Sequence, residues 1–369
     1  MKTAIIDNGI DIGTLSRYNQ QPESLMVYNG EIVSSVPPAK ITHGGLCARV
    51  FAEQSGVLPD VSISLSRDNS QRSNVNDLSI ALDWCSMNGI ELISLSMGTT
   101  RHNDSSLLYS AVEKLHQAGT VLVSAASNDC QITYPAAFTS CIGVCQTYYP
   151  GLEPECFTYL ERPFDGINVV TYPVYLPDLH IYGSNSLSAA YIAGKICREY
   201  SGMPKKGDIR SWLSEQAQRM PVGWEQSYLQ NKVSRTEEHE AIIIACYTIS
   251  TEQEDIFMKA LWEQIIKDGY SCAILAKSGE SNLSDYRFSL ESHKIPLPET
   301  LLFITRLCRP SVIVTNEWEL TYSADVIVQD DIAYKKIDSA ARLTCLFSEV
   351  TPESVWQKVC ELFENKMDA

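Results

Sequence analysis

The sequence predicts an α/β protein of two domains, each built on a parallel sheet flanked by helices. In both halves of the chain, short apolar segments alternate with amphipathic helical segments, the pattern of parallel strands joined by helical crossovers. The 369 residues are enough for two separate cores. A polar, aperiodic stretch divides the halves, so we expect a first domain over residues 1–220, a linker over 221–240 and a smaller second domain over 241–369.

The composition is that of a globular, acidic protein, with 44% hydrophobic residues and a formal net charge of −16. We expect no nucleic acid and no membrane surface as a partner, because both require a basic face. At its start the sequence has no apolar segment of signal-peptide length. Nowhere does it contain the run of about 18 apolar residues that would span a bilayer.

The twelve cysteines are scattered singly along the chain, and their closest spacing is from Cys141 to Cys145. A zinc site or a disulfide framework would show tighter clusters. We therefore expect reduced, mostly buried thiols in a cytoplasmic protein, with no metal site built from cysteine.

The first predicted strand covers residues 3–6 and ends in Asp7, which Asn8 and Gly9 follow. Asp7 is either a solvated residue of a tight turn or a carboxylate at the end of a central strand, where α/β sheets usually build their sites. His43, followed by two glycines, opens a helical segment. Taken alone, each of these residues favours a structural role.

Two helix–strand units follow and predict neighbouring parallel strands. Both strands end in small polar residues, which parallel pairing would bring to one edge of the sheet. The helices are expected at 77–87 and between Asp104 and Gly119, and the strands at 92–95 and 120–124. After them we expect a strand near 142–145, irregular strands and loops over 146–182, and helices over about 183–200 and 208–218.

The segment 183–194, GSNSLSAAYIAG, places three serines before a run rich in alanine and glycine. Such small residues allow a helix to pack its backbone closely against a neighbour. A serine at the start of a helix commonly caps it. The same position lies beside the helix N–H groups and the positive end of the dipole, where a nucleophile and its oxyanion are stabilised.

The second half repeats the α/β pattern, starting with a buried strand at 241–247. Thr251 and Glu254 predict a capping box for a helix that Gly269 ends. No P-loop or GxGxxG motif follows the strand, where the sequence is TISTEQED. We expect a Rossmann-like or degenerate P-loop-like module. It would act as a binding or structural module rather than as an active nucleotide-dependent enzyme. Further strands are expected at 270–276, 311–315, 324–328 and 342–346, and helices at 298–308 and 352–365.

Five motifs, in order, resemble those of subtilisin-like serine proteases, the subtilases of peptidase family S8, over roughly residues 1–220. They are AIIDNGID, HGGLCARV, IELISLSMG, AASN with the following Tyr-Pro-Ala, and SNSLSAAYIAG. The last is similar to the family's Gly-Thr-Ser-Met-Ala-Ser-Pro-His-Val-Ala-Gly. The resemblance implies the family's parallel sheet flanked by helices, a triad of Asp7, His43 and Ser186, and an oxyanion donor at Asn128.

The same resemblance implies six substrate-binding residues. A sheet edge of Ser96, Met97 and Gly98 would pair with the substrate backbone as an added strand. Around the S1 pocket, the resemblance places Ala126, Ser127 and Thr133.

Three departures from the family bear on this resemblance. Ser184 stands where the nucleophile motif begins with Gly, Ala190 replaces its Pro, and Ser127 replaces the Gly before Asn128. The change at Ser127 would narrow or reshape S1. A shift of the alignment would move the nucleophile from Ser186 to another nearby serine, Ser184 or Ser188.

We therefore expect a serine endopeptidase of the compact intracellular type, without a prosegment because its first strand starts at the second or third residue. Such an enzyme would act on a dedicated peptide or protein, for example by removing the leader of a ribosomally made precursor that the second domain recruits. The alternatives are a catalytically inactive pseudoprotease that binds peptides and a regulatory protein whose first domain is a scaffold. No cofactor is expected, and calcium is not indicated, since no acidic loop typical of the family's calcium sites is seen.

Overall fold

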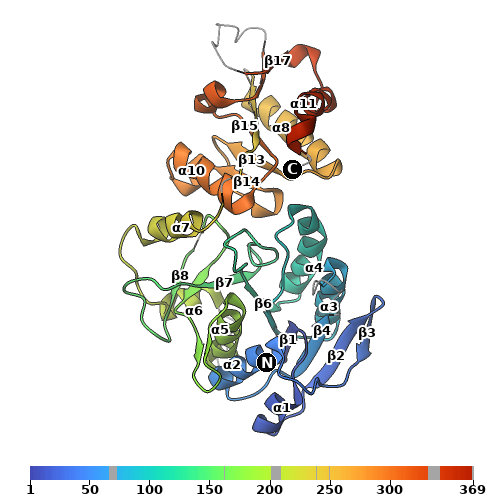
Figure 1. Cartoon of the computed structure of the whole chain (residues 1–369), viewed down its shortest axis with the longest axis vertical. Coiled ribbons are helices and arrows are strands. Elements are labelled where there is room, and N and C mark those ends of the chain that lie inside the picture. Colours follow the sequence, from blue (N-terminus) through green and yellow to red (C-terminus); the bar gives the residue numbers. More distant parts are fainter. Residues whose placement is uncertain are drawn as a thin grey trace. The chain divides into compact units, whose positions relative to one another are not determined.

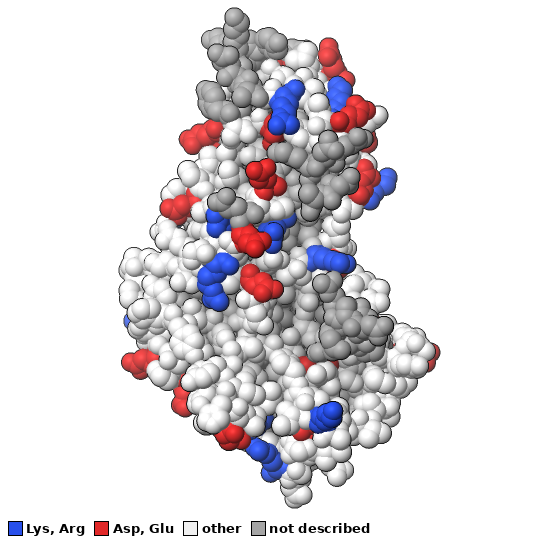
Figure 2. Space-filling model, in the orientation of Figure 1, with Lys and Arg blue, Asp and Glu red and all other residues white. Residues whose placement is uncertain are grey.

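The computed structural model of this chain describes residues 1–65, 73–161, 163–200, 209–237, 239–248, 250–330 and 341–367 (Figure 1). The chain divides into two compact units, Met1–Tyr228 and Leu229–Ala369, called unit 1 and unit 2 below. Among the described residues, no helix combines the length and the apolar character needed to cross a membrane. On the face shown in Figure 2, the described Lys and Arg side chains of unit 1 are scattered and form no continuous basic surface.

Unit 1 is built on a mostly parallel sheet, which confirms the predicted fold class. The inner strands run parallel, and β3 and β8 pair antiparallel at the two edges. The order is β3-β2-β4-β1-β5-β6-β7-β9-β8. The strands are β1 (Thr3–Asp7), β2 (Glu23–Tyr28), β3 (Glu31–Ser34), β4 (Val61–Leu65), β5 (Leu92–Leu95), β6 (Val121–Ala125), β7 (Ile142–Gln146), β8 (Phe157–Tyr159) and β9 (Val169–Thr171), with a separate hairpin of β10 (Tyr175–Leu176) and β11 (Ile181–Tyr182).

Helices cover both faces of this sheet, with α2 and α5 packed together on one face and α3 and α4 on the other (Figure 1). The helices of unit 1 are α1 (Ile12–Tyr18), α2 (His43–Ser55), α3 (Val75–Met87), α4 (Ser105–Gln117), α5 (Asn185–Tyr200) and α6 (Ile209–Gln216). The predicted start of α6 at residue 208 lies outside the described residues.

The contact between α2 and α5 depends on small side chains. Ala189, Ala190 and Ala193 of α5 are buried in the core that α2 and the sheet share. A Cβ atom on Gly194 would lie 2.5 Å from the Phe51 backbone oxygen, so only glycine allows this approach of the two backbones. The close packing predicted for the segment 183–194 is therefore present, and it holds α5 against α2, the helix that begins with His43.

Helix α7 (Trp224–Ser234) occupies most of the segment expected to be an aperiodic linker, and the boundary between the two units falls inside it. The expectation of an irregular segment is wrong there, because four widely spaced apolar side chains are buried among polar neighbours. These are Trp224, Tyr228, Leu229 and Val233, at the spacing of one helical face.

Unit 2 contains a parallel sheet, which confirms a second α/β region. Its described strands are ordered β14-β13-β15-β12-β16-β17, and each neighbouring pair is parallel. The strands are β12 (Ile242–Tyr247), β13 (Cys272–Ala276), β14 (Arg287–Ser289), β15 (Val312–Thr315), β16 (Val326–Gln329) and β17 (Leu343–Leu346). The helices are α8 (Thr251–Lys267), α9 (Leu290–His293), α10 (Leu297–Phe303) and α11 (Pro352–Met367).

The start of α8 differs from the predicted capping box. The helix begins at Thr251 and its N-cap is Ser250, whose hydroxyl accepts from the Gln253 N–H. Glu254 is 7% exposed, and its carboxylate accepts from the Thr248 N–H at 2.7 Å and from the Asn316 amide at 3.2 Å. The glutamate therefore connects the loop after β12 to the end of β15 instead of completing a capping box with Thr251.

Candidate active site

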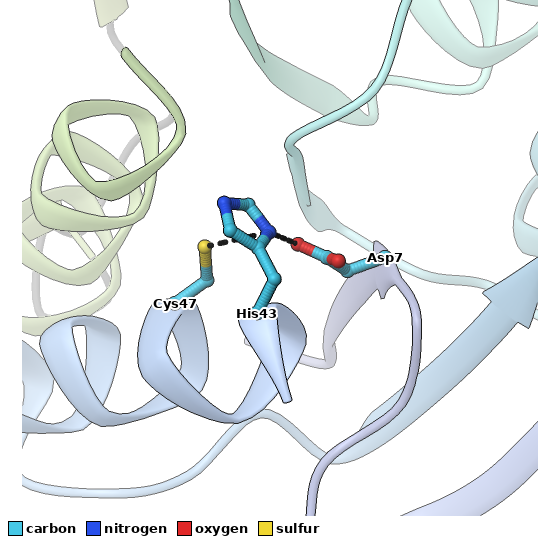
Figure 3. A group of neighbouring side chains, drawn as sticks. All are labelled: Asp7, His43 and Cys47. Atoms are coloured by element: carbon cyan, nitrogen blue, oxygen red, sulfur yellow. Dashed lines mark hydrogen bonds and ion pairs between the residues drawn. The ribbon is translucent and has the colours of Figure 1, made fainter. Parts of the chain in front are cut away.

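Asp7 and His43 form the best-defined polar pair of unit 1. Asp7 ends β1 and is 1% exposed, while His43 is the first residue of α2, whose N-cap is Thr42. His43 Nδ1 lies 2.7 Å from Asp7 Oδ2, and the second ring nitrogen points away from Asp7 (Figure 3). Since a carboxylate accepts, Nδ1 carries a proton, and in the neutral imidazole the second nitrogen is then an acceptor.

Two further donors hold the Asp7 carboxylate in this orientation. The Asn8 backbone N–H donates to Oδ1 at 2.7 Å, and the Ser96 hydroxyl donates to Oδ2, the oxygen that faces His43. A buried carboxylate with donors on both oxygens has little freedom to rotate. The imidazole ring is thereby fixed as well.

The residue after His43 must be glycine because a side chain there would clash with the turn that follows β1. A Cβ atom on Gly44 would lie 2.6 Å from the Gly9 backbone oxygen and 3.0 Å from the Asp7 Cβ. The Gly44 N–H donates to the Asn8 side chain at 2.8 Å. The first turn of α2 therefore packs directly on the turn that follows β1, and this packing brings His43 to Asp7.

Cys47 lies one turn after His43, with its sulfur 3.9 Å from Nδ1 (Figure 3). The ligand-type atoms of Asp7, His43 and Cys47 all lie within 4.8 Å of one another. Burial, and after it the charge of Asp7, raises the pKa of the Cys47 thiol well above its ordinary value. A metal ion would need a thiolate and would displace the proton between Asp7 and His43, so these side chains fit the hydrogen bond better than a metal.

The three serines at the start of α5 have different surroundings. Ser184 accepts from the Leu187 N–H at 3.3 Å and acts as a helix cap. Ser188 is 0% exposed and accepts from the Thr171 hydroxyl at 2.8 Å. Of these three, Ser186 alone lines the large cleft of unit 1, and its hydroxyl lies 3.4 Å from the Ser96 carbonyl.

That cleft has a volume of about 1340 Å³ and collects the residues expected to bind substrate. Its lining includes Ser96, Met97, Gly98, Ala126, Ser127, Asn128, Thr133 and Ser186. The Ser127 N–H donates to the Thr133 hydroxyl at 2.8 Å, which connects the loop after β6 to the base of the cleft. Asp7 and His43 are not among the residues that line it.

Ser96 links the two parts of the candidate site. Its hydroxyl contacts Asp7, the partner of His43, and its carbonyl lies within hydrogen-bond distance of the Ser186 hydroxyl. Sequence reasoning expected only a backbone role for Ser96. The position of this serine at the end of the strand next to β1 was the available signal, because adjacent parallel strands end at the same edge.

Asn185 is the functional candidate that sequence reasoning did not single out. It precedes Ser186, is 6% exposed, and contacts the loop that carries Asn128. The available signal was an asparagine at the position where the family motif has threonine.

Unit 1 thus contains a strand-end carboxylate hydrogen-bonded to a histidine, and a helix-start serine in a cleft that this pair does not line. The model of the subtilase family, peptidase family S8, matches residues 1–242, and the chain belongs to this family. This confirms the resemblance seen in the motifs.

Two characterised proteases and a solved structure are similar to the chain. The minor extracellular protease Epr of Bacillus subtilis (strain 168) is 32% identical over 97 residues, which are 25% of this chain and 15% of that protein. A thermostable alkaline protease of Halalkalibacterium halodurans is 25% identical over 234 residues, 58% of this chain and 62% of that protein. The crystal structure of a lanthipeptide protease has a TM-score of 0.45 at 14% identity, covering 60% of this chain and 81% of that one. The chain thus spans less than two thirds of the length of either characterised relative.

Proposed function

We propose that this subtilase is an active serine endopeptidase with Asp7, His43 and Ser186 as its triad. The observation that carries the proposal is the 2.7 Å contact between buried Asp7 and His43, with Ser96 reaching from Asp7 to the Ser186 hydroxyl. These are the residue types that acyl transfer to water requires: a nucleophile, a base, and a carboxylate that holds the base.

In the proposed mechanism, Asp7 keeps the proton of His43 on Nδ1, so the other nitrogen takes the proton of the Ser186 hydroxyl. The Ser186 oxygen attacks the scissile carbonyl and forms a tetrahedral intermediate. His43 then donates the proton to the leaving amine. A water molecule, deprotonated by the same nitrogen, releases the acyl group from Ser186 and regenerates the enzyme.

The oxyanion of that intermediate would be stabilised by two donors, the Asn128 side-chain amide and the Ser186 backbone N–H. Asn128 lines the cleft, and Ser186 lies in the first turn of α5, where N–H groups and the positive end of the helix dipole converge. Each charge that develops in the reaction therefore has a group of this chain to stabilise it.

We propose an extended peptide as the substrate, paired with residues 96–98 and directing one side chain toward Ser127 and Thr133. All of these residues line the same cleft. More specifically, we propose a dedicated substrate that unit 2 recruits, such as a precursor peptide from which the enzyme removes the leader. The parallel sheet of unit 2, without a phosphate-binding motif in its sequence, supports a binding task over a nucleotide-dependent one.

We place this activity in a reducing compartment such as the cytoplasm. All twelve cysteines are free thiols, and most are buried. We also propose that catalysis requires no metal or other cofactor, since each step above is assigned to a protein group.

Labelling with a fluorophosphonate probe, which phosphonylates an activated serine, tests the triad. We expect labelling of the wild type, none of Ser186→Ala, and retained labelling of Ser184→Ala and Ser188→Ala. Labelling that survives in Ser186→Ala would move the nucleophile to another residue. A folded wild type that is not labelled would contradict the proposal and favour a peptide-binding pseudoprotease.

The substrate proposal is tested by incubating a host lysate with the protein and quantifying new peptide N-termini, with Ser186→Ala as the control. A dedicated protease yields one or a few cleavage sites that the control lacks. Cleavage of many unrelated proteins at similar rates would contradict a dedicated substrate while leaving the triad unaffected.

A further inference from the structure

Asn185 uses every hydrogen-bonding group of its side chain within the protein. Its Oδ1 accepts from the Gln146 N–H at 2.9 Å, and its Nδ2 donates to the carbonyl oxygens of Ala126 at 3.1 Å and Ser127 at 2.9 Å. The side chain is 6% exposed. One amide thus joins the start of α5, the end of β7 and the loop after β6.

The loop after β6 is held from two sides. The carbonyl groups of Ala126 and Ser127 face Asn185, while the Ser127 N–H donates to the Thr133 hydroxyl at 2.8 Å. Both sides of this short backbone segment are therefore bonded. The residue that follows it, Asn128, is carried on a fixed base.

Asn185 also contacts the Asn128 side chain directly. The Asn185 backbone N–H donates to Asn128 Oδ1 at 3.4 Å. An amide carries its oxygen and its NH₂ group on two separate branches of one carbon, so this contact fixes the oxygen toward the Asn185 N–H and leaves the other branch to the NH₂ group. Asn128 lines the cleft. The contact therefore determines which end of the Asn128 amide is offered to a substrate oxygen.

A helix-capping role does not account for these contacts, because Ser184 already caps α5 through the Leu187 N–H. Threonine, which the family motif has at this position, has a single hydroxyl and could not replace one acceptor and two donors. In this chain the amide therefore forms a connection that the motif's usual residue could not form in full.

We infer that Asn185 is a positioning residue that orients Asn128 as the oxyanion donor. This inference rests on the proposed function, because it requires an oxyanion to be formed at Ser186. Asn185 itself does not touch the reacting atoms; it acts through the loop after β6 and through the Asn128 amide.

The test measures phosphonylation by the fluorophosphonate probe, with kinact and KI determined separately. The phosphoryl oxygen of the probe takes the place of the substrate oxyanion. Asn185→Asp keeps the size of the side chain but turns a carboxylate oxygen toward the carbonyls of Ala126 and Ser127. We expect kinact to fall, up to about 10²-fold for a misplaced oxyanion donor, with KI unchanged.

Asn88→Asp is the matched control. Asn88 Nδ2 donates to the Trp84 carbonyl at 2.9 Å at the exposed end of α3, outside the cleft, so the same exchange there removes a comparable contact. We expect wild-type kinact for this control. Thermal unfolding of both variants separates loss of folding from loss of positioning. Asn185→Thr is a further variant that introduces no charge, and we expect its kinact to lie between those of Asn185→Asp and the wild type.

A double variant shows whether Asn185 acts through Asn128. Asn128→Ala should lower kinact by about 10²–10³-fold. If Asn185 works by orienting that amide, adding Asn185→Asp to Asn128→Ala lowers kinact no further. Losses that multiply in the double variant, or a folded Asn185→Asp with wild-type kinact, would overturn the inference. An unlabelled wild type would overturn the proposed function and this inference together, whereas a labelled wild type with unaffected variants overturns the inference alone.

Discussion

The Ser96 hydroxyl donates to Asp7 Oδ2, the same carboxylate oxygen that lies 2.7 Å from Nδ1 of His43. We expect Ser96→Ala to slow fluorophosphonate labelling, because Asp7 loses a donor that fixes its orientation toward the imidazole. A hydrogen bond to a charged group contributes about 1.5–3 kcal/mol, which corresponds to a rate loss of roughly one to two orders of magnitude if the bond is needed in the transition state.

Ser106→Ala is the control for this prediction, since Ser106 is an exposed serine on α4. Its labelling rate should equal that of the wild type. If Ser96→Ala also reacts at the wild-type rate, the Ser96 hydroxyl has no part in orienting the carboxylate.

Gly44→Ala should damage both stability and activity. The new methyl group would lie 2.6 Å from the Gly9 backbone oxygen, so the first turn of α2 must move away from β1 and take His43 with it. Overpacking of this kind costs about 1–3 kcal/mol. Thermal unfolding and labelling rate measure the two effects, and Ser55→Ala at the other end of α2 should leave labelling unchanged. Normal labelling of Gly44→Ala would show that the turn relaxes without moving the imidazole.

We expect His102 to make the stability of unit 1 depend on pH. The residue is buried, its Nδ1 lies 3.2 Å from the Tyr134 hydroxyl, and burial lowers its pKa from an ordinary 6.5 to about 4. Between these values the unfolded chain binds a proton that the folded protein does not. The contribution of His102 is therefore complete above pH 6.5 and decreases as the pH falls toward 4.

We expect His102→Gln to remove this dependence. Relative to the variant, the wild type should lose about 2 kcal/mol of unfolding free energy between pH 7 and pH 5, measured by urea unfolding at each pH. His116→Gln, an exposed histidine of α4, should follow the wild type. Parallel pH curves for the wild type and His102→Gln would contradict a neutral buried His102.

In unit 2, Glu254→Ala should loosen the loop between β12 and α8. The change removes the acceptor of the Thr248 N–H and of the Asn316 amide, both half-buried, and leaving such a donor unsatisfied costs up to about 1–3 kcal/mol. Hydrogen–deuterium exchange at Thr248 should become faster. Glu252→Ala, an exposed residue of the same turn, should leave it unchanged. Equal protection in both variants would mean that another acceptor holds this N–H.

Much of the site could be predicted from local pattern. Asp7 follows an apolar strand, and His43 precedes two glycines at the start of a helix. Both patterns involve residues adjacent in the chain, so they are visible in the sequence. The segment 183–194 identified the helix with the candidate nucleophile, and the family motif placed that nucleophile at Ser186 but left Ser184 and Ser188 as alternatives. Their ranking depends on Thr171 and on the cleft, which are distant in the chain.

The contacts of Asn185 could not be predicted for the same reason. Its partners Gln146 and Ser127 are 39 and 58 residues away, and an asparagine before a serine has no periodic or capping signature of its own. Helix α7 was missed because its buried face consists of few residues spread among polar ones. Ser250 and Thr251 are both acceptable caps by residue type, and only the backbone shows that the helix begins after Ser250.

Gly194 lies eight residues beyond Ser186 along α5, about 12 Å away at the rise of an α-helix. Because its missing side chain lets α5 rest on the backbone of α2 at Phe51, this position sets the spacing between the helix that starts with His43 and the helix that carries Ser186. Directed evolution that randomises only the residues around the cleft would overlook it. A library that includes position 194 would push α5 away from α2 and so change the distance between the proposed base and nucleophile from the far side of the helix pair.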